Sequence, residues 1–115
     1  MAQNPDDIHR ADHIVMMAAV RGERQQQIEK WGHQNHPAGT GSEVAAKLME
    51  QWKEICDANN AAGKDDWATI AAEEFLEVLA ETDPRKLFNE VVQLAAVMVA
   101  WGESMIEDIR KGEQQ

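Results

Sequence analysis

Acidic side chains flank a short turn in the second half of the chain, and their spacing suits the binding of a cation. Before the turn stand Glu73, Glu74 and Glu77, and after it stand Glu90 and Gln93. Residues 82–84, Thr-Asp-Pro, form the predicted turn. Side chains three or four positions apart lie on one face of a helix, so each group presents its oxygens together.

The two groups are also matched in height. If the flanking segments are antiparallel helices, Glu77 lies level with Glu90 and Glu74 with Gln93, because each pair is equidistant from the turn. A helix rises ~1.5 Å per residue, so equal counts give equal heights. Converging carboxylates repel one another unless a positive charge lies between them, and hard divalent cations take oxygen ligands. The pattern predicts a Mg²⁺ or Mn²⁺ site.

The competing interpretation is a solvated acidic helix face. Two observations argue against it. No basic residue stands three or four positions after Glu73, Glu74 or Glu77, so ion pairing along the helix is absent. Glu90 opens the most apolar stretch of the chain, where an isolated carboxylate is costly.

A polar loop supplies candidates for a second site. Lys30 can contact a phosphate, Trp31 can stack on a base, and Asn35 or His36 can bond a base edge. For Trp31, a core position at the end of a helix is an equally good interpretation. His9 and His13 lie one helical turn apart, and an ordinary surface position explains them. The single Cys56 is expected to be a small core residue.

Helical signals recur along the chain, and strand signals are few. We expect four helices: from a cap at Asn4-Pro5 to about Trp31, from about Ser42 to Asn59 behind a capping box of Thr40 and Glu43, from a cap at Asp65 or Asp66 to about Glu81, and from Asp83-Pro84 to about Arg110. Residues 32–41 form a loop. The length predicts a single all-α domain over residues 1–115, with residues 110–115 as a polar tail.

The last predicted helix is apolar on all sides over part of its length. From Val91 to Trp101 nearly every residue is apolar. A helix that is apolar all round is buried all round, and a chain this small rarely encloses one of its own helices. We therefore expect a homo-oligomer, a dimer or a tetramer, in preference to a wide apolar stripe with exposed alanines.

The charge and composition of the chain argue against several classes of binding partner. The formal net charge of −10 argues against a non-specific grip on nucleic acid or on an acidic membrane. No run of about 18 apolar residues exists, so no membrane span is expected. The first residues lack a basic and then apolar leader. A single cysteine fits a reducing cytoplasm.

The chain resembles a known family at these positions. Glu-Glu-x-x-Glu, twelve further residues and then Glu-x-x-Gln resembles the signature of the all-α MazG-like nucleoside triphosphate pyrophosphatases, which ends in Glu-x-x-Asp. The stretch from Glu29 to Pro37 and the segment from Glu90 to Val97 are also similar to small MazG-like proteins of actinobacteria and phages. The resemblance covers roughly residues 20–108.

The resemblance implies a four-helix MazG-like bundle that dimerises or tetramerises, in a bacterial or phage-infected cell. It implies Mg²⁺ or Mn²⁺ and the cleavage of an NTP or dNTP, purine deoxynucleotides such as dGTP or dATP included, to the monophosphate and pyrophosphate, in control of the nucleotide pool. Glu74, Glu77 and Glu90 match metal ligands, and Glu73 matches the additional acid of the motif. We expect Glu73 to orient or deprotonate the attacking water. Gln93 replaces an Asp; its amide oxygen can coordinate a metal but cannot act as a base.

The sequence is also compatible with a function that is not enzymatic. An acidic helical protein of this size can also be a non-enzymatic binding protein, a DNA mimic or an inhibitor, whose motif is incomplete at Gln93. Turnover of a triphosphate separates the two.

Overall fold

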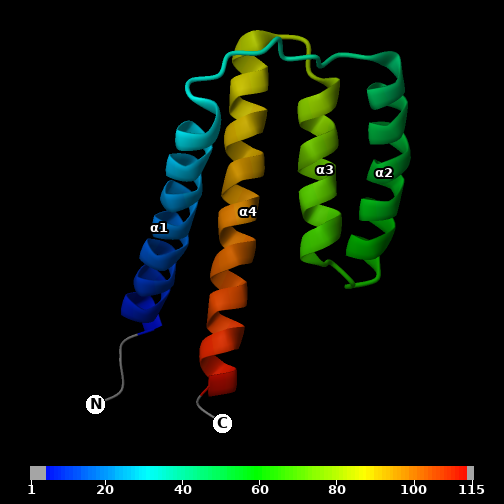
Figure 1. Ribbon diagram of the computed structural model, residues 1–115. Helices are drawn as coiled ribbons and strands as arrows, with labels where there is room; N and C mark the ends of the chain where they lie inside the picture. The colour runs from blue at the N-terminus through cyan, green and yellow to red at the C-terminus, as the bar shows by residue number, and fades with distance from the viewer. Residues whose placement is uncertain (1–4, 114–115) are drawn as a thin grey trace. The chain divides into compact units, whose positions relative to one another are not determined.

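The computed structural model describes residues 5–113, and every regular element in that range is an α-helix (Figure 1). The helices are α1 (Pro5–Trp31), α2 (Glu43–Ala61), α3 (Trp67–Ala80) and α4 (Pro84–Glu113). The predicted all-α class with four helices is therefore confirmed.

The helix ends lie close to the predicted ones, with one clear difference at the C-terminal end. Helix α4 continues through Glu113, so most of the predicted polar tail is helical. Lys111 bonds Glu107 one turn earlier at 2.9 Å, and basic side chains in a last turn favour a helix dipole. Residues 114–115 and the predicted cap Asn4 lie outside the described residues.

The chain forms two compact units. The first contains α1 and the part of α4 from Val99 onward, and the second extends from Ala38 to Met98. The second unit thus holds α2, α3 and the first half of α4. The assignment of residues 1–115 to one domain stays a prediction.

In the second unit, α2 and α3 lie side by side and antiparallel (Figure 1). The carbonyl of Thr69 accepts a hydrogen bond from Trp52 Nε1 at 3.2 Å, and the Thr69 hydroxyl accepts one from Asn59 Nδ2 at 3.4 Å. The buried apolar residues of the described chain are the small Ala45, Cys56 and Ala71. Small side chains at these positions allow the two helices to approach closely.

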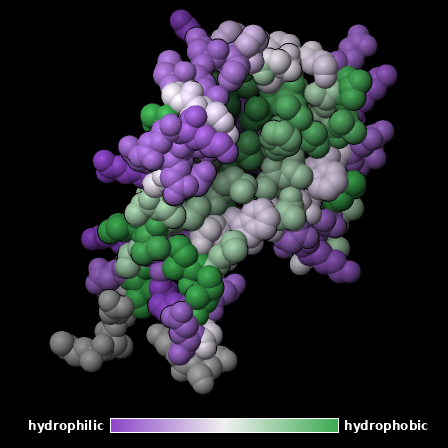
Figure 2. Space-filling view, viewed as in Figure 1, coloured by the Kyte–Doolittle hydropathy of each residue, from purple (hydrophilic) through white to green (hydrophobic). Residues whose placement is uncertain are grey.

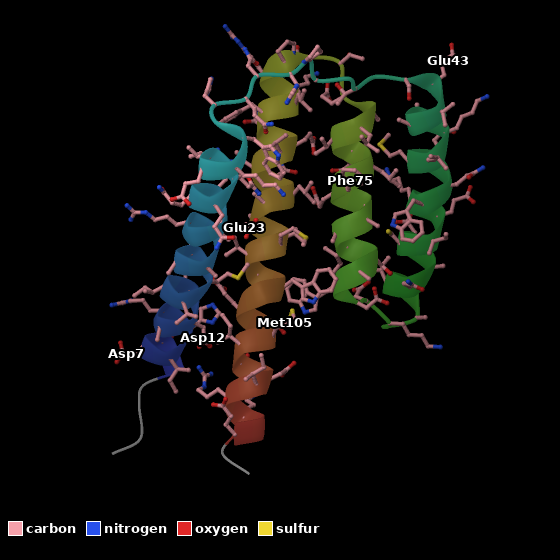
Figure 3. All side chains as sticks on the ribbon, viewed as in Figure 1. Asp7, Asp12, Glu23, Glu43, Phe75 and Met105 are labelled. Carbon is pink, nitrogen blue, oxygen red and sulfur yellow. The ribbon has the colours of Figure 1, made fainter. Side chains whose placement is uncertain are left out.

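Capping residues set where these two helices begin. Ser42 caps α2, and its Oγ accepts a bond from Ala45 N at 3.1 Å. The predicted capping box of Thr40 and Glu43 is wrong, because the Thr40 hydroxyl bonds elsewhere and Glu43 is already the first residue of the helix, at its outer end in Figure 3. Asp66 caps α3 as predicted, with its Oδ1 2.7 Å from Thr69 N.

The turn from α3 to α4 is short and well bonded. Asp83 Oδ1 accepts bonds from the backbone amides of Arg85 at 2.9 Å and Lys86 at 3.3 Å, which starts α4. The segment before α2 covers the end of α3: Thr40 Oγ1 donates to the carbonyl of Glu81 at 2.7 Å, and the Gly41 amide donates to Leu79 O at 2.8 Å. These bonds satisfy carbonyls that the end of a helix leaves unpaired.

Gly41 is required at that contact. Its φ is +90°, and a Cβ there would lie 2.6 Å from the Thr82 Cγ2 atom. Any other residue would be strained in backbone and would collide with the turn. The backbone before α2 is therefore held against the turn that precedes α4.

In the first unit, α1 packs on the C-terminal half of α4. Asp12 is buried and accepts a short hydrogen bond from Arg110, and it lies on the side of α1 that faces α4 (Figure 3). A Cβ at Gly102 would lie 2.2 Å from the Met16 sulfur, so the two helices approach closely at this point. A paired charge and a small residue thus fix this contact.

Large apolar side chains of the described residues remain substantially exposed. Hydrophobic residues are visible at the surface over α2 and α3 (Figure 2). In the second unit the exposed ones are Val44, Leu48, Ile55, Phe75, Phe88, Val91, Val92 and Met98. No side chain among the described residues is both large and fully buried.

None of the described helices is long and apolar enough to span a membrane.

Candidate metal centre

Three of the predicted ligands meet in the second unit. Glu74 and Glu77 come from α3, and Glu90 comes from α4 across the turn. One carboxylate oxygen of each residue lies within 4.8 Å of the others. Among the described residues this is the one group of three or more His, Cys, Asp or Glu side chains gathered so closely. The level pairing of Glu77 with Glu90 about the turn accounts for the convergence.

The cluster lacks partners for its own oxygens. Oε2 of Glu74 and Oε2 of Glu90 are buried, and neither accepts a hydrogen bond. A buried carboxylate oxygen without a partner loses its hydration and gains nothing in return. Both unpaired oxygens belong to side chains of the cluster, so the missing hydrogen bonds are located at the cluster itself.

The pKa values of Glu74 and Glu77 are raised, as expected for carboxylates that are buried close together. Burial raises the pKa of Glu77 to about 7, and the neighbouring charge of Glu74 and the contacts with Glu90 add to the effect. Burial also raises the pKa of Glu74, with the charge of Glu90 as the second cause. A carboxylate whose pKa is raised in this way holds a proton more tightly than it does in water.

The donor set fits a hard divalent cation. All three side chains offer carboxylate oxygens, which Mg²⁺ and Mn²⁺ prefer, and the described residues place no imidazole or thiolate in the group. A cation would satisfy the vacant oxygens and neutralise the charges that raise these pKa values. The orphaned oxygens distinguish this cluster from a solvated acidic face.

Glu73 is not one of the three converging residues, although its charge helps to raise the pKa of Glu74 and of Glu77. Glu73 borders a depression of about 280 Å³ between α2 and α3, whose other lining residues are Cys56, Asp57, Asn60, Asp65, Thr69 and Ile70. Gln93 is exposed on α4. Glu73 follows α3 onto a different side because it precedes Glu74 by one residue, which is about 100° around a helix. Its predicted role toward an attacking water stays a prediction.

Cys56 is a protonated core thiol. Burial raises its pKa to about 11, and a hydrogen bond with Glu73 is the second cause. Its Sγ lies 3.8 Å from the carbonyl of Thr69. Such a thiol is neither a ready nucleophile nor a metal ligand at neutral pH, so the expectation of a small core residue is confirmed.

The predicted substrate-binding residues belong to the first unit. The Lys30 ammonium lies 4.8 Å from the centre of the Trp31 ring, a cation–π distance. The Trp31 side chain is 55% exposed, so it is no core anchor within the described chain. Asn35 and His36 follow in the loop after α1 and are also exposed. The loop residues therefore belong to the first unit, whereas the glutamate cluster belongs to the second unit.

One depression beside this loop was not foreseen from the sequence. It measures about 390 Å³, and its lining residues are Arg24, Gln27, Ile28, Gly32, His33, Gln34 and His36. Of the four predicted substrate-binding residues, only His36 lines it. Arg24 Nη1 donates to Gln27 Oε1 at 2.6 Å. In the sequence, the only indication of this depression is the spacing of Arg24, Gln27 and Ile28, which places them on one face of the last turns of α1.

Comparison with protein-family models, with curated proteins and with solved structures gives no match for this chain.

Proposed function

We propose that the protein is a divalent-cation-dependent pyrophosphohydrolase of nucleoside triphosphates. The observation that carries the proposal is the convergence of Glu74, Glu77 and Glu90 with two buried carboxylate oxygens that have no partner. Mg²⁺ or Mn²⁺ is the proposed cofactor, and an NTP or dNTP is the proposed substrate. The resemblance of the acidic motif to the MazG-like family supplies the choice of reaction.

The reaction is attack of water on the α-phosphorus with release of pyrophosphate. A divalent cation, when bound, supplies positive charge to the phosphate oxygens and makes water a better nucleophile. The three glutamates would hold that charge on the α3–α4 hairpin. In the first unit, Lys30 is suited to a phosphate and the exposed Trp31 ring to a base.

An activity screen with a matched control tests the proposal. Each common NTP and dNTP is incubated with the protein and Mg²⁺ or Mn²⁺, and monophosphate and pyrophosphate are measured. Turnover should fall by roughly 100-fold or more in Glu74→Ala, because truncating a ligand removes the cation's support. Glu54→Gln, a change at an exposed glutamate of α2, should leave turnover unchanged.

An inert wild-type protein would redirect the function. If no triphosphate is cleaved with either cation, the proposal fails and the acidic binding protein becomes the better interpretation. In that case Glu74→Ala should weaken binding of a basic partner only slightly, because charge at a mimic surface is spread over many residues.

We also propose that the second unit is covered by another copy of the chain. Its helices bury only three small apolar residues, while eight large apolar side chains stay exposed. Exposed apolar surface of this kind is characteristic of interfaces between subunits. The exposed Val91, Val92 and Met98 belong to the apolar run that predicts an oligomer from sequence.

Light scattering tests the assembly. The particle mass should be at least about twice that of the 12.9 kDa chain. Met98→Glu should lower it, because a charge in an apolar interface is costly to desolvate. A wild-type protein that is monomeric at micromolar concentration would refute the interface, and Lys53→Glu, at an exposed position of α2, serves as the charge control.

A further inference from the structure

Two histidines of α1 converge on one carboxylate of α4 inside the first unit. His13 Nδ1 lies 2.5 Å from Glu103 Oε1, and His9 Nε2 lies 4.0 Å from Glu103 Oε2. Each imidazole therefore addresses its own oxygen of the same carboxylate. The three side chains border an open depression of about 370 Å³, which Asp6 and Arg10 also line.

The helix places the two imidazoles together. Positions 9 and 13 differ by four residues, so both side chains project from one face of α1. Glu103 follows Gly102, where α1 and α4 make their close contact beside Met16. Glu103 is only 12% exposed, whereas the side chains of His9 and His13 are 77% and 55% exposed. An anchored carboxylate thus faces two imidazoles that are free to adjust.

We propose that His9, His13 and Glu103 form a binding site for a transition-metal dication of the Zn²⁺ type. Two ligand atoms at Zn²⁺ bond lengths in a tetrahedral site lie about 3.4 Å apart. The two nitrogen–oxygen distances to Glu103 fall on either side of that value. The three ligand atoms do not all lie within 4.8 Å of one another, as those of the glutamate cluster do. Metal binding therefore requires the exposed His9 to rotate toward Glu103 and the His13 contact to open slightly. Two imidazoles and one carboxylate leave the fourth position to water.

The ligand chemistry separates this site from the glutamate cluster. Imidazole nitrogen favours Zn²⁺, Ni²⁺ and Cu²⁺ over Mg²⁺, whereas a set of carboxylate oxygens alone favours Mg²⁺ and Mn²⁺. The site joins α1 to α4, so binding a metal to it should stabilise the first unit. It does not depend on the proposed hydrolase activity.

Zn²⁺ titration of the purified protein tests the proposal, with excess Mg²⁺ present to occupy the glutamate cluster. Calorimetry should give one Zn²⁺ per chain at this site. Its affinity should fall at least about tenfold in His9→Gln, in His13→Gln and in Glu103→Gln, since each removes one ligand. The double variant His33→Gln/His36→Gln should keep the wild-type affinity. In parallel, Zn²⁺ should shift the imidazole NMR signals of His9 and His13 in the wild-type protein.

The NMR measurement keeps the test decisive if Glu103→Gln fails to fold. Three results would overturn the site: no Zn²⁺ binding, an affinity unchanged in the His9 and His13 variants, or loss of binding only in the His33/His36 variant. Any of them would leave His13 and Glu103 as an ion pair that holds α1 on α4.

Discussion

Replacing Glu77 by glutamine should make the cation-free protein more stable at pH 8 and should remove most of its response to divalent cations. In the wild-type protein the folded-state pKa of Glu77 is raised to about 7, whereas its ordinary value is 4.5. The folded state therefore binds more protons than the unfolded state between these two pH values. Stability must fall as pH rises through this window, and the loss is nearly complete by about pH 8.

The size of the effect follows from that pKa. A rise from 4.5 to about 7 corresponds to roughly 3 kcal/mol, at about 1.4 kcal/mol for each factor of ten in the ionisation constant. Solvent screening at the partly exposed hairpin reduces this to about 2 kcal/mol. Glutamine imitates the protonated side chain and can still donate to Glu90, so the variant avoids the penalty. At pH 5 the two proteins should be nearly equally stable.

Thermal melts in a chelating buffer at several pH values, at one protein concentration, provide the measurement. At pH 8 the variant should melt roughly 8 °C above wild type. Adding Mn²⁺ at a hundredfold excess over its dissociation constant should stabilise wild type by about 2.7 kcal/mol and the variant much less. Glu54→Gln, which changes an exposed glutamate of α2, should follow wild type throughout.

The difference between variant and wild type isolates Glu77 from the other titrating groups. If both proteins lose stability equally between pH 5 and pH 8, Glu77 is not the strained group. If Mn²⁺ stabilises Glu77→Gln as strongly as wild type, the cation binds elsewhere. Either result would remove the basis of the proposed metal centre.

Three other changes test separate parts of the structure. Arg110→Ala should cost roughly 3 kcal/mol in urea unfolding, because it leaves Asp12 buried without its partner; a loss below about 1 kcal/mol would contradict this. Asp66→Ala should lower the melting temperature through loss of the α3 cap, and Asp66→Asn should recover most of the loss; an unchanged melting temperature in Asp66→Ala would contradict this. Gln93→Asp should tighten Mn²⁺ binding with the fold intact, because a carboxylate is the stronger ligand; unchanged affinity in calorimetry would place residue 93 outside the site.

Local signals were enough to predict the helices. Three signals act within a few residues: Pro84 after Asp83, the cap at Asp66 and the glycine-rich loop. The sequence alone therefore locates the end of α1 and the starts of α3 and α4. Thr40 shows where this reasoning stops. Its spacing to Glu43 favoured a capping box, but its hydroxyl bonds the carbonyl of Glu81, a residue far away in the sequence. Such a competing partner exists only in the folded chain.

The candidate metal site was predictable for the same reason that the turn was. Glu77 and Glu90 are placed by counting from one turn, so their convergence needs no long-range information. Glu73 differs, because its surroundings depend on how α2 packs on α3, and the sequence does not specify that packing. His9 and His13 are exposed, as expected, but their position beside Glu103 depends on how α1 packs on α4, which the sequence does not specify.

The turn between α3 and α4 also determines which changes in chain length the protein tolerates. Inserting one residue there would move Glu90 by ~1.5 Å along α4 and about 100° around it, and so off the face that meets Glu77. The loop from Gly32 to Pro37 has no such register to keep, because the bonds to the end of α3 come from Thr40 and Gly41, which follow this loop. Insertions and deletions in related sequences should therefore occur in the loop between α1 and α2. They should be missing from the turn between α3 and α4, where only substitutions are compatible with the glutamate cluster.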